Sequence, residues 1–234
     1  MESVDPTPLS IDQIQHVFYI NLAHRVDRRT HVEAQLASVG LPFERFEAIA
    51  MANGAVGCSL SHLKLLERAV KESWSHLLIV EDDITFLNPP LFRTQLDQCL
   101  KHIGDVPSTF GLTQGSDWDV ILIAGNNVGP VQPVHSSCVQ VSRCQTTTGY
   151  LVNGPYLATL ADNVRAGVKA LMKSPMYPQL YAIDQHWFQL QAKDKWLLVV
   201  PLTVTQLAGY SDIEKRRVNY TPAMTHLVKT RQRV

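Results

Sequence analysis

The sequence lacks the features that mark nucleic-acid-binding, membrane-spanning and secreted proteins. Lys plus Arg and Asp plus Glu number 21 each, so the formal net charge is zero and no overall field favours nucleic acid or an anionic membrane. No apolar run approaches the ~20 residues that a membrane helix needs. The first residues, MESVDPTPLSIDQIQ, contain no apolar stretch of the signal-peptide type. We therefore expect no nucleic-acid partner, no integral membrane segment and a cytoplasmic location.

Cysteine is scarce and shows no paired spacing. Cys58, Cys99, Cys138 and Cys144 form no CxxC motif, which argues against a structural zinc site. Cys138 and Cys144 could face each other across a hairpin. Reduced thiols in the core are the favoured interpretation.

The remaining composition is that of one globular domain. Hydrophobic residues make up 45% of the 234 residues, enough for a sizeable core. Apolar β-rich runs alternate with segments of helical periodicity, which predicts an α/β sheet flanked by helices. We expect a flexible tail over residues 1–14, one α/β domain over 15–205 and a basic segment over 206–234. The expected strands are 16–22, 42–49, 76–80, 118–124, 131–142 (two short edge strands), 146–153 and 195–204, and the expected helices are about 32–40, 59–73, 89–100, 154–172 and 184–191.

An acidic run follows one of these strands. In HLLIVEDDITF, residues 76–86, four apolar residues lead into Glu81, Asp82 and Asp83. If the strand continued, Glu81 and Asp83 would point one way and Asp82 the other. Converging carboxylates repel one another unless a cation joins them, and Mg²⁺ or Mn²⁺ suits carboxylates together with the oxygens of a diphosphate. The alternative is a solvent-facing acidic turn.

Three segments together resemble glycosyltransferase family 25. They are YINLAHRVDRR (19–29), GAVGCSLSHLKLLERA (54–69) and LLIVEDDITF (77–86), in the family's order and at about its spacing. TTTGYLVN (146–153) and Asp184 are weaker matches later in the chain. The resemblance implies a GT-A type fold, a Rossmann-like mixed sheet flanked by helices. It also implies a nucleotide-sugar donor, a divalent metal held by a DxD-type motif, and inversion at the anomeric carbon.

The resemblance assigns the acidic run to the metal. Asp83 is the foremost expected ligand of Mn²⁺ or Mg²⁺. Either Glu81 or Asp82 accompanies it, because the motif here is EDD rather than DxD. His186 is a further candidate ligand, with a packed or solvent-facing histidine as the alternative.

Candidate donor-binding residues lie at the ends of strands and near helix starts. Asn21 and Leu22 end the first strand, where the resemblance places the nucleoside. Arg25 and Arg28 follow, and guanidinium groups suit diphosphate oxygens, although either arginine could simply be solvated. Asn126 follows another strand and could bind donor-sugar hydroxyls, although asparagine is equally common in turns.

Ser61 and His62 are the remaining donor-binding candidates. Near the expected start of the helix at 59, exposed N–H groups and hydroxyls would suit an anion or a ribose. The alternative is a capping serine beside a buried histidine.

An inverting transfer needs a base for the acceptor hydroxyl, and Asp184 is the candidate. Its alternative role is the N-cap of the helix 184–191. The segment 206–217 could close over the diphosphate, with Lys215, Arg216 or Arg217 contacting it.

The sequence thus predicts a metal-dependent inverting transferase. It would move a hexose, galactose or glucose, from a UDP-sugar to a hydroxyl of a glycan or of a hydroxylated protein. The alternative is a catalytically silent, glycosyltransferase-like binding module. A nucleotidyltransferase is a distant third, because INLAHRVDRR lacks the glycine-rich phosphate loop of that class.

Overall fold

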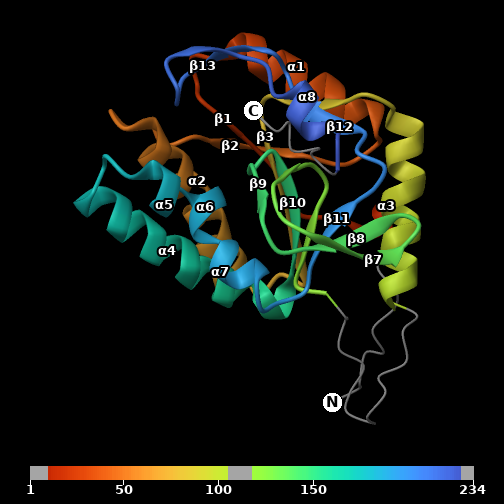
Figure 1. The fold of residues 1–234 in the computed structure, drawn as a ribbon. Helices are drawn as coiled ribbons and strands as arrows, with labels where there is room; N and C mark the ends of the chain where they lie inside the picture. The colour runs from red at the N-terminus through yellow and green to blue at the C-terminus, as the bar shows by residue number, and fades with distance from the viewer. Residues whose placement is uncertain (1–9, 105–117, 228–234) are drawn as a thin grey trace, which may run out of the picture.

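One eight-stranded mixed sheet organises the protein (Figure 1). The computed structural model describes residues 10–104 and 118–227. Three strand pairs are parallel, β1 with β2, β1 with β3 and β5 with β11, and the others are antiparallel. The expected α/β class with a mixed sheet is therefore confirmed. In spatial order the strands are β2 (Glu44–Glu47), β1 (Val17–Asn21), β3 (His76–Glu81), β10 (Gly149–Asn153), β5 (Val120–Leu122), β11 (Trp196–Val199), β8 (Cys138–Val141) and β7 (Val131–His135).

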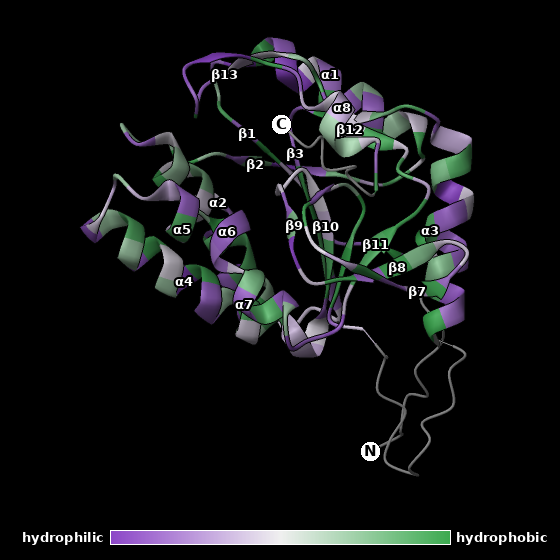
Figure 2. Ribbon diagram, viewed as in Figure 1, coloured by the Kyte–Doolittle hydropathy of each residue, from purple (hydrophilic) through white to green (hydrophobic). Residues whose placement is uncertain are grey.

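Helices cover both faces of the sheet. α1 (Val26–Ser38) and α3 (Pro89–Gly104) lie on one face, and α2 (Gly54–Lys71) and α4 (Leu157–Lys173) lie on the other (Figure 1). The strands are buried on both sides because successive side chains alternate: Leu78 joins the α1 and α3 core, and its neighbours Leu77 and Ile79 join the α2 and α4 core. Figure 2 shows α4 with hydrophobic and hydrophilic bands, the pattern of a helix with one buried side.

Short elements complete the fold beyond the sheet. The small strand pairs are β4 (Ile84–Phe86) with β12 (Val204–Gln206), β13 (Gly209–Ser211) with β14 (Arg216–Val218), and β6 (Asn126–Asn127) with β9 (Cys144–Gln145). The short helices are η1 (Ile11–Gln13), η2 (Gly154–Tyr156), α5 (Pro178–Tyr181), α6 (Ile183–His186), α7 (Phe188–Gln191) and α8 (Thr221–Met224). None of the helices in the described ranges has the length and apolarity that crossing a membrane requires.

Several boundaries differ from the sequence expectations, including the start of α1, which is Val26 rather than about 32. α2 begins at Gly54 rather than 59, because the Asn53 side chain caps it by accepting the Ala55 and Val56 N–H groups. The expected helix 184–191 is two short helices, α6 and α7. Residues 11–14 of the expected tail pack on the core, with Ile11 and Ile14 buried, and residues 1–9 lie outside the described ranges.

All four cysteines are free thiols, as expected. Cys99, Cys138 and Cys144 are buried, and Cys58 is half-buried.

Candidate active site

A cavity of about 630 Å³ opens beyond the carboxyl ends of β1 and β3. These strands are parallel neighbours, with Ile20 opposite Glu81, so both end at the same edge of the sheet. Ligands of α/β sheets bind at this kind of edge. The acidic run, the first turns of α2, residues 145–147, α6 and the β13–β14 hairpin all line the cavity.

On the α1 side of the cavity, one guanidinium serves two carboxylates. Arg28 donates from Nη1 to Asp82 at 3.0 Å and to Asp83 at 2.8 Å. Its Nη2 donates to the Tyr210 carbonyl oxygen at 2.9 Å. Burial lowers the pKa of Arg28, but the charges of Asp83 and Asp82 raise it by more. The net pKa is above the usual value, so the guanidinium stays charged. All three side chains are at most 14% exposed, so water screens their charges weakly.

Arg28 balances the negative charge of Asp83 only in part. Its Oδ1 is buried and has no hydrogen-bond partner within residues 10–104 and 118–227. Burial, and then the charge of Glu81, raise the pKa of Asp83 to about 7 despite Arg28. Burial also raises the pKa of Asp82, against the opposing effects of Asn21 and Arg28. A buried carboxylate oxygen without a donor, beside a second carboxylate, fits a hard divalent cation.

At the end of β1, Asn21 hydrogen-bonds to Asp82 of the Asp82–Asp83 pair and is not placed to bind a nucleoside. The Asn21 amide donates to Asp82 Oδ2 at 2.8 Å, and its oxygen accepts from Arg45 at 3.1 Å. Asn21 is 1% exposed and is absent from the cavity lining, so its amide is not available to a uracil edge. Leu22 does line the cavity. Arg25 is absent from the cavity lining and pairs with Asp27 and Asp212.

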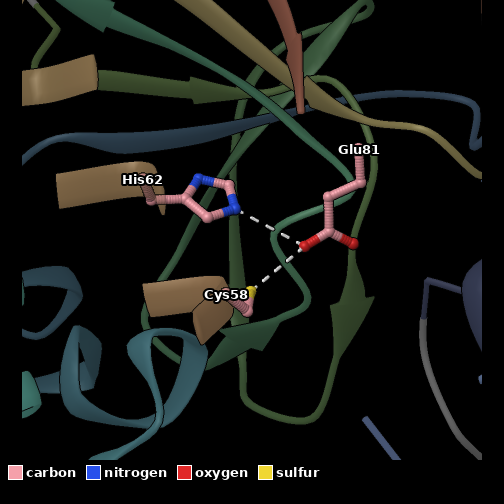
Figure 3. Close-up of side chains that lie close together, drawn as sticks. All are labelled: Cys58, His62 and Glu81. Atoms are coloured by element: carbon pink, nitrogen blue, oxygen red, sulfur yellow. Dashed lines mark hydrogen bonds and ion pairs between the residues drawn. The ribbon is translucent and has the colours of Figure 1, made fainter. Parts of the chain in front are cut away.

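On the α2 side, Glu81 faces a histidine and a thiol (Figure 3). Glu81 Oε1 accepts from the Thr147 hydroxyl at 2.5 Å and lies 3.5 Å from His62 Nε2 and 3.6 Å from Cys58 Sγ. Gln206 donates to Glu81 Oε2 at 3.4 Å. Burial raises the pKa of Glu81, but the nearby His62 ring and the hydrogen bonds from Thr147 and Cys58 together lower it by more, so the pKa lies below its usual value. Burial, followed by the Glu81 charge, raises the pKa of the Cys58 thiol well above its usual value.

The alternation expected for the acidic run therefore ends with the strand. β3 stops at Glu81, and residues 82 and 83 form a turn, so both aspartates reach Arg28 while Glu81 turns toward α2. Glu81 and Asp83 contact different side chains, whereas a continued strand would have pointed both in the same direction.

Ser61 and His62 lie in the second and third turns of α2 and not at its start. The Ser61 hydroxyl donates to the Gly57 carbonyl oxygen and accepts from the Ile49 N–H, both at 2.8 Å, which fastens the loop 48–51 to the helix. The expected site of free N–H groups at 59–62 is therefore wrong. Gly54 and Ala55, in the true first turn, line the cavity together with Ser61 and His62.

Asp184 lies in the cavity lining and is not a helix cap. The N-cap of α6 is Ala182, and the Asp184 carboxylate accepts the Thr146 N–H at 3.1 Å. This overturns the capping alternative. Burial raises the pKa of Asp184, with the Glu81 charge adding to the effect against the Thr146 hydrogen bond.

Of the two remaining candidates, only Asn126 lines the cavity. Its amide donates to Gln145 at 3.0 Å. His186 does not: its Nε2 lies 3.1 Å from the Gln189 amide, and its ring packs beside Gly167 on α4. The structure therefore does not bring His186 to the carboxylates.

The segment after Gln206 forms a hairpin over the cavity. Ser211, Asp212, Ile213, Glu214, Lys215 and Val218 contribute to the lining. The hairpin is attached to α1 by the Arg25–Asp212 ion pair and by the Arg28 hydrogen bond to Tyr210. A Cβ at Gly54 would lie 3.0 Å from the Ile213 Cα, so the hairpin packs closely on the start of α2. Residues 228–234 of the expected closing segment lie outside the described ranges.

Several cavity residues escaped the sequence analysis. Cys58 is four residues before His62, a spacing that places both on one helical face, and this signal was present in the sequence. Thr146 and Thr147 belong to a strand-like run, and nothing in that run distinguishes them. Gln206 and Asp212 reach the site through long-range packing that the local sequence does not encode.

Comparison with known proteins agrees with this geometry. Residues 49–121 match the model of glycosyltransferase family 25 (LPS biosynthesis protein), which includes the cavity segments of α2 and β3. The match supports assignment of the chain to family 25. The chain is 29% identical to a Glycosyltransferase 25 family member of Drosophila pseudoobscura pseudoobscura, over 45% of this chain and 21% of the relative. It is 28% identical to a putative glycosyltransferase of Haemophilus influenzae, over 30% of this chain and 33% of the relative.

These alignments span about a fifth to a third of the relatives' lengths. Among solved structures, the mannose-1-phosphate geranyltransferase from Thermus thermophilus aligns at a TM-score of 0.47 and 11% identity, over 80% of this chain and 73% of that chain.

Proposed function

We propose that this domain is a family 25 glycosyltransferase that moves galactose or glucose from a UDP-sugar to a hydroxyl of a glycan or hydroxylated protein. The observation that carries the proposal is the buried Asp83 Oδ1, which has no hydrogen-bond partner among the described residues and lies beside Asp82 in a cavity that also contains Asp184. The family match supports a sugar-nucleotide donor.

Asp83, with Asp82, would hold Mn²⁺ or Mg²⁺. Asp82 accompanies Asp83 rather than Glu81, because the two aspartates share Arg28 while Glu81 is engaged by Thr147 and faces His62. When bound, the cation supplies the positive charge that a departing diphosphate requires. Asn21 and Arg28 keep both carboxylates directed to one place, which lowers the cost of assembling the site.

Asp184 would remove the proton from the acceptor hydroxyl as that oxygen attacks the anomeric carbon. Its raised pKa brings it closer to ambient pH, which makes the carboxylate a stronger base. The Thr146 N–H holds the carboxylate in the cavity by a hydrogen bond of 3.1 Å. Attack from the side opposite the leaving diphosphate would invert the anomeric centre.

The β13–β14 hairpin would close the cavity over the donor. Its closure remains a prediction, tested by limited proteolysis: donor with Mn²⁺ should protect residues 207–218, and unchanged cleavage would contradict it.

Thermal unfolding with a panel of nucleotide sugars tests the donor assignment. With Mn²⁺, one UDP-hexose should raise the melting temperature, and EDTA should abolish the shift. At a hundred times the dissociation constant, binding stabilises the native state by about 2.7 kcal/mol. No shift with any UDP-sugar would contradict the proposal. A shift without turnover on any acceptor or on water would favour the silent binding module.

A further inference from the structure

Three side chains on the α2 side of the cavity combine the ligand types of a transition-metal site. Cys58 and His62 are four residues apart on α2, so they share one face of the helix. Glu81 meets them from the end of β3 (Figure 3). The thiol sulfur, a ring nitrogen and a carboxylate oxygen all lie within 4.8 Å of one another.

The His62 ring is already oriented for coordination. Its side chain is fully buried, and Nδ1 lies 2.8 Å from the Tyr150 hydroxyl. That contact leaves Nε2 directed at Glu81, 3.5 Å away, with no hydrogen-bond partner in the described part of the chain. A buried polar atom without a partner is costly, and a hydrogen bond to the second ring nitrogen is the usual support of a metal-binding histidine.

We propose that Cys58, His62 and Glu81 bind one Zn²⁺ ion in the floor of the cavity, with the fourth coordination position open to the cavity. All three residues line that cavity, and three protein ligands with one open position is the arrangement of zinc sites that bind water or a substrate. The missing CxxC motif excludes only the closed, cysteine-rich type of site. On binding, a Zn–S bond forms and the Cys58 thiol proton passes to solvent.

This site differs in chemistry from the Asp82–Asp83 pair. A thiolate and an imidazole select zinc-class metals, whereas carboxylates alone suit Mg²⁺ and Mn²⁺. The zinc site goes beyond the proposed transfer reaction and does not depend on it.

The test measures metal binding without nucleotide or acceptor. The full chain, freed of metal, is titrated with Zn²⁺ in competition with a chromophoric chelator, and separately with Co²⁺ as a spectroscopic probe. We expect one Zn²⁺ per chain and a thiolate-to-cobalt charge-transfer absorption. Cys58→Ser should remove the absorption, and both Cys58→Ser and His62→Gln should weaken Zn²⁺ binding at least about tenfold.

Matched variants separate the site from its surroundings. Cys99→Ser changes a buried thiol in the other core cluster and should leave zinc affinity unchanged. Tyr150→Phe removes the contact to His62 Nδ1 and should weaken zinc binding about 10- to 100-fold while the cobalt–thiolate absorption persists. Melting curves of the metal-free variants identify any that fail to fold.

Absence of stoichiometric zinc binding by the wild-type chain would overturn the proposal. So would full retention of zinc affinity and of the cobalt absorption in a folded Cys58→Ser variant. Because no sugar nucleotide is present, either result leaves the proposed transferase function untouched.

Discussion

The two sides of the cavity shift the pKa values of neighbouring carboxylates in opposite directions. On the α1 side, Asp82 and Asp83 share Arg28, and the pKa of each is nevertheless raised by burial. On the α2 side, Glu81 is one residue away, and His62 and hydrogen bonds hold its pKa below the usual value. The end of β3 at Glu81 produces the difference, because the chain then turns and directs the next two carboxylates toward α1.

The comparison shows that a consecutive acidic run need not act as one site. The α1 side retains excess negative charge that a hard cation would neutralise, which suits donor binding. The α2 side has its carboxylate satisfied and, with Asp184 nearby in the lining, is suited to proton transfer and softer ligands. Substitutions on the two sides should therefore affect different steps.

Asp184→Asn should give the largest effect. Loss of the base should lower kcat by about 10²- to 10⁴-fold, while the affinity for donor stays unchanged because the α1 side is intact. Steady-state kinetics and donor titration measure the two quantities. Wild-type kcat in this variant would remove Asp184 from the mechanism.

Asp83→Asn should affect binding of the donor as well as turnover. Metal charge stabilisation is worth several kcal/mol and each 1.36 kcal/mol is tenfold in rate, so kcat/KM should fall at least about 100-fold. Excess Mn²⁺ should not restore it. If kcat/KM stayed near the wild-type value, the metal would have to be held elsewhere.

Arg28→Met should destabilise the metal-free protein by about 3–5 kcal/mol, because it leaves two buried carboxylates without their cation. Arg29→Met is the matched control: Arg29 is 51% exposed and pairs with Glu33, and because water screens this pair, its loss should cost far less stability. Urea unfolding in EDTA measures both. Mn²⁺ should restore part of the loss in Arg28→Met alone, and equal losses in the two variants would contradict the charge balance described here.

The pH dependence of stability should show the raised pKa of Asp83. Its folded-state pKa of about 7 exceeds the usual 3.8, so the folded protein keeps a proton that the unfolded chain releases between these values. The resulting stabilisation is complete below about pH 4 and is lost as pH rises through 7. In EDTA, wild type should lose on the order of 1–2 kcal/mol between pH 5 and 7.5 relative to Asp83→Asn. Parallel pH profiles would show that the pKa of Asp83 is not raised.

The sequence predicted the parts of the fold that local patterns determine. The apolar run 77–80 predicts a buried strand, and the carboxylates after it mark the edge where the cavity lies. Gly54 and Gly57 precede the helix that the sequence predicted from residue 59, yet both lie in α2. Gly57 is small for a tertiary reason, because a Cβ there would lie 2.5 Å from the Ile49 carbonyl oxygen.

Side-chain roles were less predictable because they depend on distant partners. Asn21 could be placed at a strand end, but only the fold shows that Asp82, 61 residues later, engages its amide. Asp184 resembled a helix cap by position, and the backbone of Thr146 determines its actual contact. The β13–β14 hairpin was missed as a structure because its polar residues carry weak strand preference.

The most direct test of the Asp82–Asp83 site is calorimetric titration of UDP into wild type and Asp83→Asn, each with Mn²⁺ and with EDTA. We predict that wild type binds UDP tightly only with Mn²⁺, and that Asp83→Asn shows the same weak binding in both conditions. Equal Mn²⁺-dependent affinity in the two proteins would contradict the assignment of the α1 side as the donor's metal site.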